Sequence, residues 1–173
     1  MDAKERRRLI LHMLQNGHEP VTGTELARRM GVSRQVIVQD MAVLRASGEQ
    51  IWATPQGYLT VPSALPKGKT RTFAVCHDRR RLEEELLIII DQGGQVLDVA
   101  VEHPVYGELK GLLLLSSRQD VADFLVRLDQ TGAEPLLALT GGTHIHTVQA
   151  RSEQILDGIQ AALRRAGLLL EDN

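Results

Sequence analysis

A break in the residue pattern at residues 61–69 is the feature that most constrains how this chain folds. The segment contains Pro62, Pro66 and Gly68 and lacks the apolar periodicity found on either side of it, which is typical of a connector. A chain of 173 residues can form one large domain or two small ones. We therefore predict two domains, over residues 1–62 and 71–173, joined by a linker at 63–70.

The first part has the pattern of three short helices followed by a β-hairpin. Apolar residues recur at helical spacing, with Gly31 as an end signal for the second helix and Ser33 as a cap for the third. Two β-rich segments on either side of Pro55-Gln56-Gly57 predict the hairpin. The expected helices span 3–15, 24–30 and 33–46, and the expected strands span 51–54 and 58–61.

The second part alternates short strands and helices in the order β-α-β-β-α-β-β-α. This order favours an α+β sandwich in which helices cover one face of a mostly antiparallel sheet. The expected strands span 72–77, 95–102, 108–115, 136–139 and 143–149, and the expected helices span 79–91, 118–130 and 152–166.

The third helix of the first part carries polar residues suited to reading DNA. Ser33, Arg34, Gln35 and Gln39 lie on its outer face, and Arg and Gln can form paired hydrogen bonds with guanine and adenine in the major groove. The arginines at positions 6–8 are expected to add phosphate attraction at most, because they lie on the first helix. The segment resembles the winged helix-turn-helix of the biotin repressor, with residues 55–58 as the tip of the wing.

Charge and composition fit an intracellular regulator. The net charge is +2 up to Pro62 and −4 beyond it, a mild basic excess at the end that we expect to bind DNA. No apolar run approaches the roughly 20 residues that span a bilayer, and the charged N-terminus is unlike a signal peptide. The single cysteine, Cys76, cannot form an internal disulfide. We expect a cytoplasmic protein with no membrane partner.

Histidines of the second part indicate a metal site. His144 and His146 alternate along an expected strand, so both rings point to the same face. His77 lies where a strand meets a helix, and on that helix Glu83 and Glu85 flank the apolar stripe whereas Glu84 faces away. The spacing does not choose between Glu83 and Glu85. Three imidazoles and a carboxylate suit zinc, nickel or ferrous iron.

Several motifs of the second part resemble the three-histidine (3H) domain family. They are Cys76-His77-Asp78, Glu84-Glu85-Leu86, Gly93-Gly94, His103-Pro104-Val105-Tyr106-Gly107 and Gly142-Thr143-His144-Ile145-His146-Thr147. Fused to this kind of helix-turn-helix, the domain is similar to nicotinic-acid-responsive repressors of NAD biosynthesis and niacin salvage. The resemblance implies that His77, Glu85, His144 and His146 hold one divalent metal ion, nickel or zinc, and that nicotinic acid is the effector.

The His-Pro-Val-Tyr-Gly motif has two interpretations. His103 and Tyr106 line the effector pocket in one of them, and in the other His103 forms hydrogen bonds within its own turn. A pyridine carboxylate needs an apolar wall, a cation or donor for the carboxylate, and a partner for the ring nitrogen.

We predict a repressor and not an enzyme. Two copies should read half-sites one DNA turn apart, so we expect a homodimer, because one winged helix buries too little surface for tight operator binding. The apolar run Leu112–Leu115 belongs either to the dimer contact or to the core. The alternatives are a repressor for which the metal itself is the signal, and a metal-dependent hydrolase fused to a DNA-binding domain.

Overall fold

The chain forms two compact units that divide between residues 65 and 66. The computed structural model describes residues 1–60 and 68–171. The connector residues 61–67 lie outside the described residues, as does Val61 at the end of the expected hairpin. Each unit has its own hydrophobic core.

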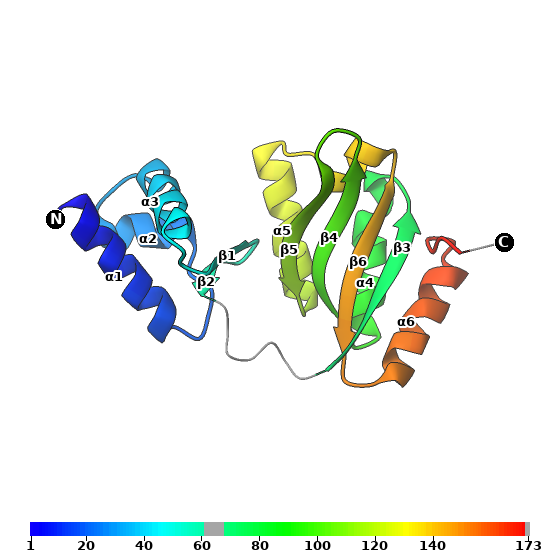
Figure 1. The fold of residues 1–173 in the computed structure, drawn as a ribbon. Helices are drawn as coiled ribbons and strands as arrows, with labels where there is room; N and C mark the ends of the chain where they lie inside the picture. The colour runs from blue at the N-terminus through cyan, green and yellow to red at the C-terminus, as the bar shows by residue number, and fades with distance from the viewer. Residues whose placement is uncertain (61–67, 172–173) are drawn as a thin grey trace. The chain divides into compact units, whose positions relative to one another are not determined.

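The N-terminal unit consists of three helices and a two-stranded antiparallel hairpin (Figure 1). Asp2, Thr22 and Ser33 each cap a helix by accepting a hydrogen bond from the backbone N–H three residues on. Ile37, Met41 and Leu44 are buried, as predicted for the inner face of the third helix. The elements are α1 (Ala3–Asn16), α2 (Gly23–Met30), α3 (Arg34–Ala46), β1 (Ile51–Thr54) and β2 (Gly57–Thr60).

Two of the N-terminal arginines have a structural role that the sequence interpretation missed. Arg6 donates through Nε to Oδ2 of Asp40 at 2.6 Å, and Arg7 donates through Nη1 to Oδ1 at 3.3 Å. Asp40 lies on α3 and is only 2% exposed. A buried carboxylate needs such partners, because its hydration is lost. Arg6 and Arg7 therefore hold α1 against α3, and their expected attraction of phosphate stays a prediction.

Replacing Arg6 with methionine should destabilise the N-terminal unit. The buried Asp40 carboxylate would keep only the longer contact to Arg7, and an incompletely paired buried charge is costly. Arg8→Met is the matched control, because Arg8 is exposed. We expect a lower melting temperature for Arg6→Met and no change for Arg8→Met by circular dichroism. Equal melting of both variants would show that the pairing contributes nothing.

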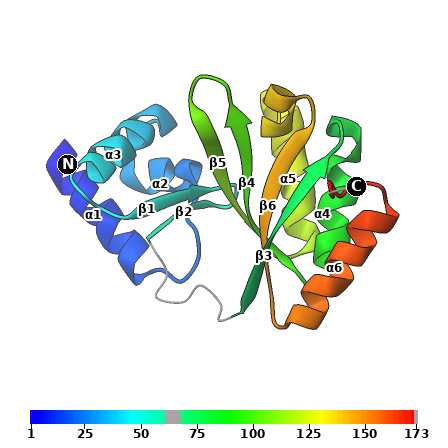
Figure 2. The same cartoon turned by 45° about the vertical axis from the view of Figure 1, so that its right-hand side comes forward.

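The C-terminal unit is a two-layer sandwich with a four-stranded sheet in the order β3-β6-β4-β5, all pairs antiparallel. Its three α-helices lie on the same face of the sheet (Figures 1 and 2). The elements are β3 (Lys69–Cys76), η1 (Arg79–Arg81), α4 (Leu82–Asp91), β4 (Gln95–His103), β5 (Gly107–Leu115), α5 (Arg118–Thr131), η2 (Leu136–Thr140), β6 (Thr143–Ala150) and α6 (Glu153–Arg165).

The core of this unit lies between the sheet and the helices. Leu86 and Ile89 of α4 and Leu156 and Ile159 of α6 are fully buried. Within the run Leu112–Leu115, Leu113 and Leu115 point into the same core. The α+β class and the mostly antiparallel sheet predicted from the sequence are confirmed.

One predicted strand is wrong. Residues 136–140 form a 3₁₀ turn, in which Ala138 N–H donates to the Pro135 carbonyl at 3.0 Å. Gly141 ends the turn in the left-handed conformation, at φ 64°. A four-residue apolar run does not distinguish a strand from a short buried helix. In addition, β3 begins at Lys69, so the last two residues of the expected linker belong to the sheet.

Candidate metal centre and DNA-reading surface

Strand β6 presents two buried histidines to the helix layer. His144 and His146 are each 1% exposed, whereas Thr143 and Ile145 between and beside them face the other side of the sheet and are exposed. The register pairs His146 with Phe73 and His144 with Val75, so β3 lies directly beside both rings. The alternation along β6 thus brings the two imidazoles together, as the strand pattern predicted.

Glu85 of α4 lies at the centre of three imidazoles. Its carboxylate oxygens are 2.5 Å from Nε2 of His77, 3.2 Å from Nε2 of His144 and 3.1 Å from Nε2 of His146. Glu85 is fully buried, and His77, just past the end of β3, is 8% exposed. The single ligand atoms of His77, Glu85 and His144 lie within 4.8 Å of one another. All four residues predicted from the sequence and the resemblance therefore meet at one point.

The geometry distinguishes among the three neighbouring glutamates of α4. Glu83 and Glu84 are exposed, and Glu84 forms an ion pair with Arg81. Glu85 alone of the three points into the domain, where it contacts the histidines. Spacing did not choose between Glu83 and Glu85, and of these two Glu85 contacts the histidines, whereas its role as a metal ligand stays a prediction.

Backbone carbonyls orient all three rings. Nδ1 of each imidazole lies 2.7–2.8 Å from a carbonyl oxygen, which can only accept a hydrogen bond, so Nδ1 carries the proton. Each Nε2 is then left facing the Glu85 carboxylate. This is how proteins orient histidine ligands of a metal, with the second ring nitrogen fixed by a neighbouring acceptor. The three carbonyls belong to Asp78, Gly142 and Asp98.

Two polar atoms at the centre have no hydrogen bond, although Oε2 of Glu85 lies within hydrogen-bond distance of His77 and His144. They are Oε1 of Glu85 and Nε2 of His146, which lie 3.1 Å apart. Buried polar atoms without a hydrogen bond are rare in folded proteins and call for an explanation such as an ion. Two ligands of one cation point at the ion and not at each other, which fits this arrangement.

The charges at the centre also favour a cation. Burial by itself would raise the pKa of Glu85, but the facing imidazoles of His146, His144 and His77 outweigh burial and hold that pKa well below its usual range. Burial would lower the pKa of His77 and of His146, and the Glu85 carboxylate outweighs it and raises both. The carboxylate thus attracts positive charge onto the rings, and a divalent ion can supply this charge in place of protons.

Gly142 brings two of the histidines together. Its carbonyl accepts hydrogen bonds from the backbone N–H of His77 at 3.3 Å and from Nδ1 of His144 at 2.8 Å. A Cβ atom at this position would lie 2.5 Å from the His77 carbonyl oxygen, and the φ of 107° is one that side chains rarely adopt. The chain before β6 can approach His77 this closely only because residue 142 is glycine.

Gly142→Ala should destabilise the C-terminal unit and disturb the histidine cluster. The left-handed backbone and the overlap with His77 together should cost roughly 3 kcal/mol or more. Gly141→Ala is the matched control, because its φ is 64° and no atom lies within 4 Å of its Cβ position, so it should cost about 1–2 kcal/mol. Urea denaturation of both variants measures the difference, and equal losses would contradict a close approach at Gly142.

The His-Pro-Val-Tyr-Gly motif forms the turn between β4 and β5. Nδ1 of His103 accepts hydrogen bonds from the N–H groups of Val105 and Tyr106, at 3.1 and 3.2 Å, and the His103 and Tyr106 rings lie 5.0 Å apart. Tyr106 is 75% exposed. The structure thus shows the hydrogen-bonded turn, and effector binding by His103 and Tyr106 stays a prediction.

The residues predicted to read DNA share one exposed surface. Arg34, Gln35 and Gln39 lie on the outer side of α3, and Ser33 caps the helix by accepting from Val36 N–H at 3.3 Å. Among the described residues, no carboxylate lies within ion-pair distance of Arg34, in contrast to Arg28 of α2, which pairs with Glu25. The first turn of α3 therefore presents a free guanidinium and an amide, as a recognition helix requires.

Both parts of the chain match known families. Residues 6–59 match an HTH domain and residues 70–172 match the 3H domain. This chain belongs to the 3H domain family.

Two relatives of this 3H domain protein are named as transcription repressors, and each matches nearly the whole chain. This chain is 43% identical over 169 residues to a probable transcription repressor, NiaR, of Thermotoga maritima, covering 98% of this chain and 95% of that protein. It is 41% identical over 174 residues to the transcription repressor NadR of Bacillus subtilis, covering 99% and 96%. The prediction of a DNA-binding transcription repressor that is not an enzyme is confirmed by these relatives and by the HTH domain.

No helix among the described residues is long and apolar enough to cross a membrane.

Proposed function

We propose that this 3H domain repressor controls genes of NAD biosynthesis or niacin salvage in the bacterial cytoplasm, with nicotinic acid as co-repressor and one bound divalent transition metal. The observation that carries the proposal is the convergence of three imidazole Nε2 atoms on the buried Glu85 carboxylate, in a chain that matches NiaR and NadR over nearly its whole length.

His77, Glu85, His144 and His146 would hold the metal. Imidazole nitrogens with one carboxylate oxygen suit nickel or zinc, whereas magnesium and calcium prefer oxygen ligands alone. The ion would supply a cross-link between β6 and the segment that runs from the end of β3 into α4, since Glu85 and His144 are 59 residues apart in the sequence. We assign it an organising role, because the histidine rings and Glu85 are buried.

DNA binding would use two copies of the chain. Arg34 and Gln35 would contact base edges, and Ser33 and Gln39 would lie beside them at the groove. A homodimer would place two such helices on half-sites about 34–36 Å apart. Nicotinic acid would favour the dimer conformation in which this spacing fits the DNA.

Selection of bound fragments from the source genome tests the proposal. Fragmented genomic DNA is passed over the metal-loaded protein with nicotinic acid, with nicotinamide or with neither, and the bound DNA is sequenced. We expect enrichment of DNA upstream of genes for NAD synthesis or niacin uptake, and stronger enrichment with nicotinic acid. Enrichment of unrelated promoters, or equal enrichment in all three arms, would refute the proposed target genes or the proposed effector, respectively.

A further inference from the structure

The flank of α3 beside the hairpin carries an arginine at each end. At about 3.6 residues per turn, Arg34, Val38 and Arg45 fall within roughly 40° of one another around the helix. Gln35 and Gln39 lie on the neighbouring outer face and are exposed. The helix thus has an outer row of polar side chains and, next to it, a flank with a positive charge at each end, of which the Arg45 end has no assigned role.

Arg45 is held against both strands of the hairpin. Its Nε donates to the carbonyl of Ile51 on β1 at 2.9 Å, and its Cζ lies 5.9 Å from the centre of the Tyr58 ring on β2. A cation at this distance over an aromatic ring is attracted to the ring. The hairpin itself has no positive charge, because residues 51–60 contain no lysine or arginine. Arg45 therefore supplies the hairpin with a cation that its own residues lack.

The Arg45 guanidinium is exposed and has no anionic partner. Among residues 1–60, no carboxylate lies within ion-pair distance of Arg8, Arg34 or Arg45, whereas the other arginines pair with Asp40 or Glu25. Of these three, only Arg45 has its guanidinium in a hydrogen bond within the part of the chain that the structure describes. A cation whose position is already fixed loses little conformational freedom when it binds an anion.

The ring that holds Arg45 is itself fixed by the segment before α2. Tyr58 N–H donates to the Val21 carbonyl at 2.8 Å, and Val21 N–H donates to the Tyr58 carbonyl at 2.8 Å. This close approach needs glycine at position 57, where φ is 132° and a Cβ atom would lie 2.5 Å from the Val21 carbonyl oxygen. Tyr58 is therefore a rigid support for the guanidinium and not part of a loose loop.

We propose that Arg45, supported by Tyr58, binds a phosphate of the DNA backbone beside the groove that the outer face of α3 enters. Arg45 lies about 16 Å beyond Arg34 along the helix axis, whereas a recognition helix contacts base edges with its first turns. An arginine at the far end therefore adds affinity that does not depend on the base sequence. The inference rests on DNA binding by the HTH domain, and the proposed effector and target genes do not enter it.

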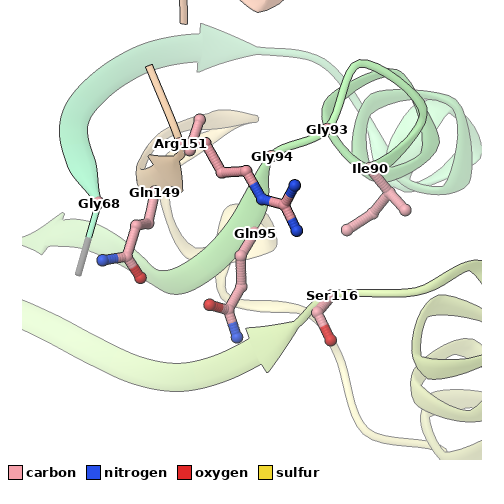
Figure 3. Close-up of a pocket in the computed structure, with 9 residues that line it drawn as sticks. Gly68, Ile90, Gly93, Gly94, Gln95, Ser116, Gln149 and Arg151 are labelled. Atoms are coloured by element: carbon pink, nitrogen blue, oxygen red, sulfur yellow. The ribbon is translucent and has the colours of Figure 1, made fainter. Parts of the chain in front are cut away.

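Binding of the full-length protein to a random-sequence duplex, measured by fluorescence anisotropy over a range of salt concentrations, tests the contact. Arg45→Gln should make the slope of log affinity against log salt concentration shallower by about one for each bound chain, because one phosphate fewer is neutralised. Arg45→Lys keeps the charge and should keep the slope. The control for net charge is Arg151→Gln, which should leave the slope unchanged, because Arg151 is an exposed arginine of the C-terminal unit, at the end of its sheet (Figure 3).

Tyr58 should act through Arg45 as a positioning residue. Tyr58→Phe keeps the ring and should bind the random duplex as the wild-type protein does. Tyr58→Leu removes the support of the guanidinium and should weaken this binding by less than Arg45→Gln does. In the Arg45→Gln background, Tyr58→Leu should have no further effect, because residues that act through one contact are not additive. Additive losses, or equal losses for Tyr58→Phe and Tyr58→Leu, would overturn the support by the ring.

Chemical protection tests the same contact without a substitution, and it decides if Arg45→Gln does not fold. The wild-type protein is treated with the arginine reagent phenylglyoxal, with and without the random-sequence duplex, and modified arginines are identified by mass spectrometry. DNA should protect Arg45 and leave Arg151 reactive. An unchanged salt slope in folded Arg45→Gln, equal changes of slope in Arg45→Gln and Arg151→Gln, or a lack of protection at Arg45 would overturn the phosphate contact.

Discussion

The His144→Ala/His146→Ala variant should lose the proposed metal and the proposed response to nicotinic acid, while its N-terminal unit should stay folded and bind DNA weakly. The two rings supply two of the four proposed ligand atoms, and their removal leaves Glu85 facing His77 alone. Metal content by elemental analysis and operator binding by fluorescence anisotropy measure the two losses. We expect metal affinity to fall by more than the roughly tenfold to hundredfold seen when only an outer-shell partner of a metal ligand is removed.

Two further variants separate loss of ligands from loss of fold. His12→Ala/His18→Ala removes the same number of histidines from exposed positions of the N-terminal unit and should keep the metal. Glu85→Gln keeps the size of the side chain and removes the charge, so it should lose the metal with little change in shape. Full effector-dependent repression by the His144→Ala/His146→Ala variant would make the site incidental and would break the proposed link between metal, effector and DNA.

Arg34→Ala should reduce binding to the selected operator by about 1–3 kcal/mol and reduce discrimination among bases at one position of each half-site. The reason is that a paired hydrogen bond from arginine to guanine contributes this much to discrimination, and Arg34 lies free on the first turn of α3. Binding to random DNA should change little. Measurements on operator, single-base variants and random DNA over a range of salt concentrations provide the comparison.

Arg8→Ala is the control for a contact that does not depend on sequence. Arg8 is the exposed member of the N-terminal arginine cluster, since Arg6 and Arg7 pair with Asp40. If Arg8 reaches a phosphate, its loss should weaken binding to operator and to random DNA alike. It should also reduce the slope of log affinity against log salt concentration by about one. An equal loss on both DNAs for Arg34→Ala would count against base reading by α3.

Periodicity was sufficient to predict most of the fold. The three N-terminal helices and the helices and strands on either side of the β4–β5 turn lie within a few residues of the predicted ranges, because long apolar patterns of period 3.6 or 2 carry most of the information. The strand predicted at 136–139 was wrong, because four apolar residues are too few to define a period. Asp40 also carried a usable signal: it lies three residues after buried Ile37, on the inner face of α3, where a carboxylate needs a partner.

The candidate metal centre could be predicted only in part from the residues. Alternation placed His144 and His146 on one face, but the apolar stripe of the helix left Glu83 and Glu85 equivalent, and the resemblance to the 3H domain was needed to choose. The packing of α4 on the sheet makes the difference, since it buries Glu85 and exposes Glu83. The Asp98 carbonyl that orients His146 could not be foreseen, because this contact depends on the register of β4 and β6. The Gly142 carbonyl lies two residues before His144, and its position depends on the conformation of the turn that precedes β6.

Operator binding, measured with metal and nicotinic acid varied independently, tests the proposed coupling between metal, effector and DNA. The wild-type protein is prepared metal-loaded or metal-free, and its affinity for the selected operator is measured by anisotropy with and without nicotinic acid. We expect nicotinic acid to tighten operator binding by roughly 5–150-fold in the metal-loaded protein, and to have no effect on the metal-free protein. Equal tightening without metal, or full tightening by metal alone, would contradict the proposed coupling.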